Sequence, residues 1–262
     1  MPKLSAVIIT YNAELLIDRC LTSLVDIADE IIVIDSFSTD STEMICKKYN
    51  VRFVQHEFTG FMDQKNFSLT LASYKYILSL DADEALSEDL KKSLLEVKND
   101  IRFEGYFVNR LSNFCGQWIL HSGWYPDRQL RLFNKEMGKW GPINVHENFR
   151  MIAGIKTGRL KGDLLHWPYS SVEDYADKIE AYSDIAAREY LKDGKKVFFF
   201  TPFIHMIWRF IMTYFFRLGF LDGRYGYVIC SMGAKSSFLN KGMILTPLHL
   251  YGKKVNSTKT NL

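Results

Sequence analysis

The first 100 residues alternate short runs of branched apolar side chains with stretches whose apolar residues repeat at helical spacing. The runs cover residues 4–10, 31–34, 51–54 and 76–80, and they are apolar almost throughout, without a regular polar alternation. Strands with this pattern are buried on both faces, which is typical of a parallel sheet between two layers of helices. The sequence therefore predicts an α/β fold with a mostly parallel sheet and helices on both faces.

Several polar side chains stand where helices are expected to begin. Asn12 precedes the first helical pattern, Asp40 with Glu43 resembles a capping pair, and Ser87 and Ser171 precede two later helical patterns. Such side chains accept hydrogen bonds from the free N–H groups of a first helical turn. We expect a helix after each of these positions.

Three of the four expected strands end in polar residues that suit a ligand. The three strings are Thr10-Tyr11-Asn12, Asp35-Ser36 and Asp81-Ala82-Asp83-Glu84. In open parallel sheets, ligands bind beyond the carboxyl ends of the strands. Asp81 and Asp83 could hold a divalent cation, since Mg²⁺ usually lies between carboxylates and substrate phosphates. The alternative is a solvated acidic turn, but the position at a strand end favours a metal site, and Asp35 could bind a base or ribose.

Two common phosphate-binding loops are absent from the sequence. No G-x-G-x-x-G string follows the first expected strand, and no G-x-x-x-x-G-K-[ST] string occurs. Neither a dinucleotide-binding fold nor a P-loop nucleotidase is therefore supported. Phosphate groups are expected to be held by a metal ion and side chains.

The charge is unevenly distributed along the chain. Residues 192–262 contain eleven Lys or Arg and two acids, a net charge of +9, whereas residues 1–191 carry −6. The apolar tract 197–221 is interrupted by charged residues, so no uncharged window of about 18 residues exists and we expect no membrane span. Its basic, aromatic composition favours an amphipathic helix in the plane of an anionic leaflet. The alternative is a helix packed on the rest of the protein.

The four cysteines are widely separated and form no C-x-x-C pair. This usage favours a reducing compartment, and the amino-terminal residues do not resemble a signal peptide. We expect a cytoplasmic protein that binds peripherally to the inner face of the cytoplasmic membrane.

Four strings in order along the chain resemble those of the family 2 glycosyltransferases, which have the GT-A fold. They cover residues 5–12, 34–42, 64–66 and 81–84. Strings at 126–133, 145–147 and 221–224, with Trp140, resemble the branch that includes lipopolysaccharide-core β-glucosyltransferases. The resemblance covers nearly the whole chain.

The resemblance implies roles for individual residues on the donor side. Thr10, Tyr11 and Asn12 would line the nucleotide pocket, Asp35 would contact the base, Lys65 would lie near the diphosphate or base, Asp81 would meet the ribose or the metal, and Asp83 would coordinate the metal. The metal would be Mg²⁺ or Mn²⁺.

The family's inverting mechanism needs a carboxylate that deprotonates the acceptor hydroxyl. Glu147 matches this position in the branch, with His146 as the rival base or a leaving-group contact. A structural ion pair of Glu147 with Arg128 or Arg131 is the alternative. His166 is a weaker candidate that could close over the donor or order a water on the metal, and packing is an equal explanation.

The resemblance implies transfer of one hexose from a nucleoside-diphosphate sugar, UDP-sugar favoured, to a lipid-linked or cell-surface glycan. The Q-x-x-R-W string of processive members is absent, which disfavours polymerisation. Residues 1–194 would form the catalytic domain (nucleotide-sugar half 1–100, acceptor half 101–170, helix 171–194), and 195–262 the amphipathic tail. A sugar nucleotidyltransferase and a non-catalytic membrane adaptor are the alternatives, and no nucleic-acid partner is expected.

Overall fold

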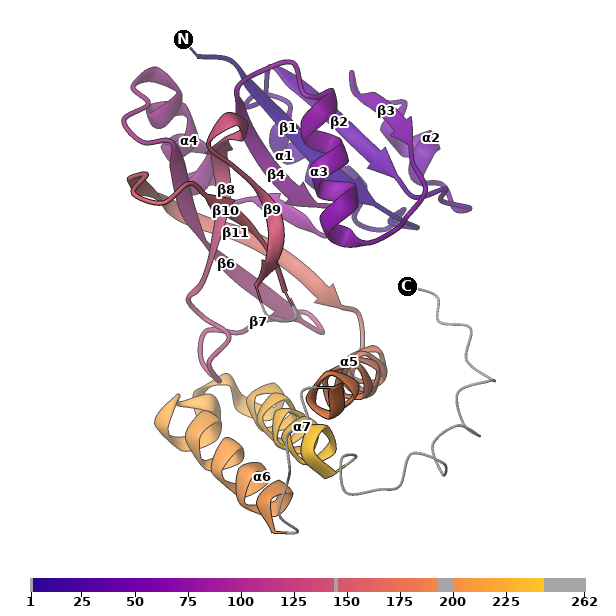
Figure 1. The fold of residues 1–262 in the computed structure, drawn as a ribbon, viewed down its shortest axis with the longest axis vertical. Coiled ribbons are helices and arrows are strands. Elements are labelled where there is room, and N and C mark those ends of the chain that lie inside the picture. The colour runs from indigo at the N-terminus through magenta and orange to yellow at the C-terminus, as the bar shows by residue number, and fades with distance from the viewer. Residues whose placement is uncertain (1, 144–145, 193–199, 243–262) are drawn as a thin grey trace. The chain divides into compact units, whose positions relative to one another are not determined.

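The computed structural model describes residues 2–143, 146–192 and 200–242 (Figure 1). Two compact units can be distinguished. The first comprises residues 1–113 and 125–168, and the second comprises residues 114–124 and 169–262. This grouping places the helix after residue 171 with the C-terminal helices. The sequence instead predicts that this helix belongs to the catalytic domain.

The strands are β1 (Leu4–Thr10), β2 (Glu30–Asp35), β3 (Arg52–Gln55), β4 (Tyr76–Asp81), β5 (Glu84–Leu86), β6 (Gly105–Phe114), β7 (Gln117–Trp118), β8 (Asp127–Asn134), β9 (Gly138–Ile143), β10 (His146–Met151) and β11 (Thr157–Tyr169). The α-helices are α1 (Ile17–Leu24), α2 (Thr42–Cys46), α3 (Phe61–Leu71), α4 (Glu88–Asn99), α5 (Val172–Lys192), α6 (Thr201–Ile211) and α7 (Gly223–Gly242).

The first unit is built on one sheet with the strand order β3-β2-β1-β4-β8-β6-β11-β5. β3, β2, β1 and β4 are parallel, whereas β8 is antiparallel to β4 and β6 is antiparallel to β8. β9 and β10 form a separate antiparallel hairpin. The predicted α/β fold of GT-A type is confirmed, and its parallel half is the part that the apolar runs predict.

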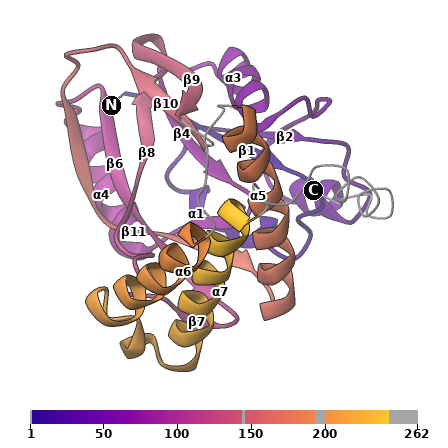
Figure 2. The ribbon, with the colours of Figure 1, turned by 60° about the horizontal axis from the view of Figure 1, so that its bottom comes forward.

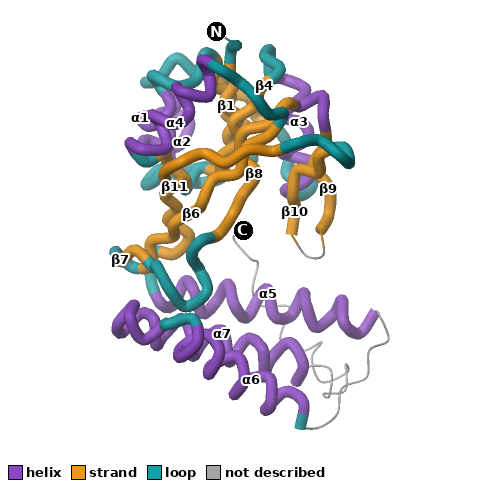
Figure 3. The backbone as a smooth tube through the Cα atoms, turned by 90° about the vertical axis from the view of Figure 1, so that its left-hand side faces the viewer, coloured by secondary structure: helices purple, strands orange, loops and turns teal. Residues whose placement is uncertain are grey.

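Helices cover both faces of this sheet (Figure 3). On one face, α1, α2 and α4 pack through a core that includes Ile17, Cys46 and Leu90. On the other face, α3 and the β9–β10 hairpin share a core with Trp140 and Phe149. The strands are therefore buried on both sides at their centres, and their polar ends remain available for a site.

The expected helix starts are confirmed at two positions. The Ser87 hydroxyl accepts a hydrogen bond from the N–H of Leu90 (3.3 Å), and the Ser171 hydroxyl accepts one from the N–H of Asp174 (3.0 Å). The carboxylate of Asp40 accepts a hydrogen bond from the N–H of Thr42 (3.0 Å), the first residue of α2, although Ser41 stands between them.

The second unit contains α5, α6 and α7, with α6 and α7 side by side (Figure 2). Its core gathers Phe114, Tyr175 and Ile229. The helix of the apolar tract does not run on to residue 221, because α6 gives way to a π-helical turn at 212–216 and the chain reverses at Leu218 (φ 54°). Within the described residues, no helix is long and apolar enough to cross a membrane.

Candidate functional site

The polar ends of three neighbouring strands meet at one edge of the sheet. Thr10 at the end of β1 is opposite Asp35 at the end of β2, and Ile9 is opposite Asp81 at the end of β4. Parallel pairing brings these carboxyl ends together, as the strand pattern predicts. Three of the residues assigned to donor binding therefore lie in one region.

Asp35 is fully buried beneath the loop that follows it. Its carboxylate accepts hydrogen bonds from the backbone N–H (2.8 Å) and from the hydroxyl of Ser38. The Ser38 hydroxyl in turn accepts a hydrogen bond from the N–H of Asn12 (2.8 Å). The loops after β1 and β2 are thus joined through one serine, which fixes the two walls expected to hold a nucleotide.

The prediction that Asn12 caps the first helix is wrong. α1 begins only at Ile17, and Asn12 has a φ of 47°, a left-handed conformation that Asn tolerates better than most residues. Its side-chain oxygen instead accepts a hydrogen bond from the N–H of Thr39 (2.8 Å). Tyr11 beside it is exposed. Asn12 therefore shapes the site and does not start the helix.

Both carboxylate oxygens of Asp81 are engaged by cations. Lys65 Nζ lies 2.9 Å from Oδ1, and Arg131 Nη2 lies 3.1 Å from Oδ2. Burial raises the pKa of Asp81, but the charges of Lys65 and Arg131 outweigh it and hold that pKa well below its usual range. Asp81 is thus an anion held between two cations, although its buried Oδ1 has no hydrogen-bond partner among the described residues.

Arg131 continues this network into the sheet. Its guanidinium also contacts Glu84, whose side chain is fully buried, and Arg110 lies 3.4 Å from the same carboxylate. Arg110 is paired in turn with Asp127 (2.7 Å). Burial lowers the pKa of Arg131, while Glu84 and Asp81 outweigh it and raise it. The sequence pattern predicts no role for Glu84 or Arg110, although Glu84 belongs to the acidic string at the end of β4.

Asp83 is in a different situation from Asp81. Its side chain is about as exposed as that of Asp81 (33% and 27%), but its neighbour is a histidine, with His166 Nε2 3.4 Å from Oδ2. The other ring nitrogen of His166 contacts the Ser112 hydroxyl (3.0 Å), which orients the imidazole. Among the residues that the structure describes, no Lys or Arg forms an ion pair with Asp83. The structure therefore brings together a carboxylate and an imidazole from positions 83 residues apart in the sequence.

These donors fit a divalent cation that takes most of its ligands from elsewhere. Carboxylate oxygen and imidazole nitrogen both bind such ions. No group of three His, Cys, Asp or Glu side chains that could hold a metal occurs in the described part of the chain. Mg²⁺ is commonly bound by one or two carboxylates, substrate phosphates and water, and the carboxylate of Asp83 is a ligand of the type that such a site uses.

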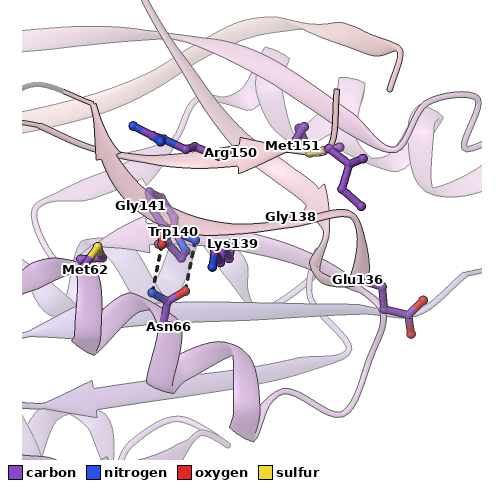
Figure 4. A pocket seen from close by; sticks show the side chains of 10 residues that line it. Met62, Asn66, Glu136, Gly138, Lys139, Trp140, Gly141, Arg150 and Met151 are labelled. Carbon is purple, nitrogen blue, oxygen red and sulfur yellow. Dashed lines mark hydrogen bonds between the residues drawn. The ribbon is translucent and has the colours of Figure 1, made fainter. Parts of the chain in front are cut away.

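Three consecutive residues of α3 bind three different parts of the site. Gln64 donates to the Ser36 hydroxyl after β2 (3.0 Å), Lys65 pairs with Asp81 after β4, and Asn66 binds the β9–β10 hairpin. Asn66 donates to the carbonyl oxygen of Trp140 and accepts from its N–H, both at 3.1 Å. These two bonds lie beside an open hollow of about 640 Å³ (Figure 4).

The hairpin held by Asn66 carries the expected base. His146 and Glu147 lie at the start of β10, where Glu147 is opposite Pro142 of β9. The side chains of both residues lie outside the described part of the structure, as does Val145, so their roles stay predictions. Lys65 Nζ lies 4.7 Å from the centre of the Trp140 ring, which links the hairpin to the Asp81 network.

Arg128 lies three residues before Arg131 on β8, opposite Asn109 of β6. It is exposed, and no ion pair joins it to any residue that the structure describes. Arg128 is therefore apart from the buried network to which Arg131 belongs.

The comparisons with known proteins agree with this geometry. The family model described as glycosyl transferase family 2 matches residues 5–161. The lipopolysaccharide core biosynthesis glycosyltransferase LpsC of Rhizobium meliloti is 30% identical over 264 residues, covering 93% of each chain. The uncharacterized glycosyltransferase RT0209 of Rickettsia typhi is 30% identical over 249 residues, covering 91% of this chain and 85% of that protein. The crystal structure of S. aureus TarS 1–349 with UDP is 16% identical with a TM-score of 0.49, covering 92% of this chain and 90% of that one. The region that the family model matches contains Thr10, Asp35, Asp81 and Asp83 and ends before His166, and the chain belongs to glycosyltransferase family 2.

Proposed function

We propose that this glycosyltransferase transfers one hexose from a nucleoside-diphosphate sugar, with inversion, and that Asp83 with His166 holds the divalent cation. The observation that carries the proposal is the contrast between the two aspartates of the same string. Among the described residues, Asp81 forms ion pairs with Lys65 and Arg131, whereas Asp83 forms none with a Lys or Arg and has His166 beside it. Asp81 is therefore assigned to positioning the donor, and the metal to Asp83.

The donor would lie across the carboxyl ends of β1, β2 and β4. Thr10, Tyr11 and Asn12 would line the nucleotide, and the buried Asp35 would shape the base pocket through its hydrogen bonds to Ser38. Mg²⁺ or Mn²⁺ at Asp83 would offset the charge of the leaving diphosphate when bound. Lys65 supplies fixed positive charge nearby, which favours binding of the same anionic group.

The acceptor hydroxyl would be deprotonated by Glu147. The register of β10 and the hydrogen bonds of Asn66 to Trp140 support this assignment, because they tie the strand that carries Glu147 to the helix that contributes Lys65. A general base contributes about 10²–10⁴-fold to a rate. E147Q should lower turnover by that factor and leave donor binding unchanged, with the exposed Glu96→Gln as the control. Near-normal turnover of E147Q would remove Glu147 from this role.

The metal assignment is tested by thermal unfolding with UDP and Mn²⁺. A ligand present at a hundredfold excess over its Kd stabilises the folded state by about 2.7 kcal/mol. Wild type and the exposed control Asp89→Asn should both show the rise in Tm, and D83N should lose it. A D83N variant that responds like wild type would overturn the assignment of the metal to Asp83.

The acceptor is proposed to be a lipid-linked or cell-surface glycan. The relative LpsC is named for lipopolysaccharide core biosynthesis, and its match extends over both compact units of this chain. A panel of UDP-, GDP- and dTDP-sugars, scored for transfer with metal and with chelator, would identify the donor. A sugar nucleotidyltransferase would instead release pyrophosphate from a nucleoside triphosphate.

The second unit is proposed to bind the surface of an anionic membrane. Large apolar side chains are exposed on and after α6, among them Ile204, Trp208, Phe216 and Leu221. Arginines lie along the same described segment, residues 200–224, and Asp222, the acidic residue in it, is buried. Apolar side chains with cations beside them fit an anionic leaflet. Sedimentation with anionic vesicles should fall sharply for W208S/F216S, and unchanged binding would refute the proposal.

A further inference from the structure

A small pocket in the first unit lies outside the residues assigned so far. Its volume is about 190 Å³, and its lining includes Phe107, Asn109, Tyr125, Arg128 and Arg159. Pockets that enclose a whole small-molecule ligand occupy roughly 300–1,000 Å³. This pocket therefore has room for one functional group or one part of a larger molecule.

Two arginines give the pocket its charge. Arg128 comes from β8 and Arg159 from β11, and both are exposed. Neither forms an ion pair with a carboxylate anywhere in the described ranges, whereas Arg110 and Arg131 of the same sheet are paired with carboxylates. Two guanidinium groups that form no ion pair with a described residue, around one small pocket, favour an anion, because Arg binds phosphate and carboxylate oxygens through charge-assisted hydrogen bonds.

The other polar groups of the pocket are held in place. The Tyr125 hydroxyl donates to Asp163 (2.9 Å), and the Asn109 side chain also hydrogen-bonds to Tyr125. The Tyr125 hydroxyl therefore uses its proton in the hydrogen bond to the carboxylate of Asp163. Phe107 and Leu160 complete the wall with apolar surface. The pocket thus combines apolar side chains and hydrogen-bonded polar groups with two exposed arginines.

The position of the pocket relates it to the transfer site. Arg128 and Arg131 are three residues apart on β8, a distance of roughly 10 Å along a strand. β8 runs antiparallel to β4, so the step from Arg131 to Arg128 leads past the carboxyl end of β4, where Asp81 binds Arg131. An acceptor held by Arg128 would therefore extend away from the donor residues along the same sheet.

We propose that Arg128 and Arg159 form an anion subsite for the acceptor, which takes a phosphate or carboxylate group on a sugar next to the one that is glycosylated. This inference rests on the proposed function, since it specifies the acceptor of the same reaction. The acceptor is then an anionic glycan, and the two arginines determine specificity without touching the reacting atoms.

The test is calorimetric titration of the full chain, without metal, with glucose 6-phosphate, glucuronate and neutral glucose. Wild type should bind at least one of the two anionic sugars and should not bind glucose. R128Q/R159Q should bind that anion about tenfold or more weakly, and R128K/R159K should recover part of the loss. The control R52Q/R102Q removes the same charge from exposed positions elsewhere and should bind like wild type.

Each other result counts against the subsite. Equal binding by R128Q/R159Q and wild type, equal weakening in R52Q/R102Q, or no binding of either anion by wild type would overturn it. Comparison of phosphate with carboxylate identifies the group. The UDP–Mn²⁺ response of R128Q/R159Q, measured separately, should equal that of wild type. If wild type lacks that response, the donor assignment fails independently of the anion result.

Discussion

The removal of Arg131 tests whether the buried charge network holds the donor site together. The Arg131 side chain is 4% exposed and binds both Asp81 and Glu84, and the Glu84 side chain is 0% exposed. Breaking a buried ion pair by removing one partner typically costs about 3–5 kcal/mol, since a charge is left uncompensated. We expect R131M to lose that much stability at pH 7, which lowers the Tm by roughly 6–20 °C for a domain of about 150–250 residues.

Two comparison variants separate this effect from general damage. K65M should lose only about 1.5–3 kcal/mol, the value for hydrogen bonds to a charged group, because Asp81 keeps its contact with Arg131. R102M removes an exposed arginine paired with Asp100 and should change stability by less than about 1 kcal/mol. R131M/E84Q should be more stable than R131M, because one of the two carboxylates that lose Arg131 is then neutral.

The pH dependence has a defined sign. The folded-state pKa of Asp81 lies below its unfolded value of about 3.9, so the unfolded chain takes up this proton first as the pH falls. The stabilisation that Arg131 provides through Asp81 is therefore complete above about pH 5 and is lost progressively below it. The stability gap between wild type and R131M should stay constant from pH 8 to pH 5 and narrow by pH 3.

Urea unfolding followed by circular dichroism measures these differences. The order of stability should be wild type and R102M first, then K65M, then R131M. A loss below about 1 kcal/mol for R131M at pH 7, or a gap that does not change between pH 7 and pH 3, would refute the view that Arg131 compensates these buried carboxylates.

Three further predictions follow from the same contacts. N66A should lower kcat and change the donor KM less, because it loses two hydrogen bonds to the hairpin that carries the expected base. The exposed Asn99→Ala should behave like wild type. D222N should lose about 1–3 kcal/mol, because its amide would face N–H donors such as that of His121 (3.0 Å) in place of a carboxylate oxygen. Burial, with nearby acids, raises the pKa of Cys46 to about 11, so mass spectrometry should find this thiol unmodified by iodoacetamide at pH 8 until the protein unfolds.

The parallel half of the fold was predictable because its signal is local. Each apolar run is continuous, and each ends where the chain turns polar, so the strands and the edge that carries Thr10, Asp35 and Asp81 can be derived without knowing any long-range contact. The antiparallel half gives a weaker signal. β6 is ten residues long but contains Asn109, Arg110 and further polar residues that serve the charge network and the pocket, which hides the strand pattern.

The pairing of the site residues could not be predicted, because it depends on contacts between distant segments. Asp81 and Asp83 look equivalent in the sequence as a D-x-D pair. Arg131, 50 residues later, pairs with one of them, and His166 approaches the other. The strand order of the sheet, with β8 beside β4, explains why Arg131 pairs with Asp81 and not with Asp83.

The string Gln64-Lys65-Asn66 also indicates how α3 packs, which its family resemblance does not imply. Successive residues of an α-helix point about 100° apart, so three in a row cannot share one buried face. Gln64 and Lys65 are both buried in the structure and Asn66 is half-buried, which requires that other segments surround this turn of α3 on several sides. Buried polar groups must find partners, and here the partners are the loop after β2, the end of β4 and the β9–β10 hairpin. A helix turn of this composition therefore fixes the relative positions of the segments expected to bind the donor and the strand expected to supply the base.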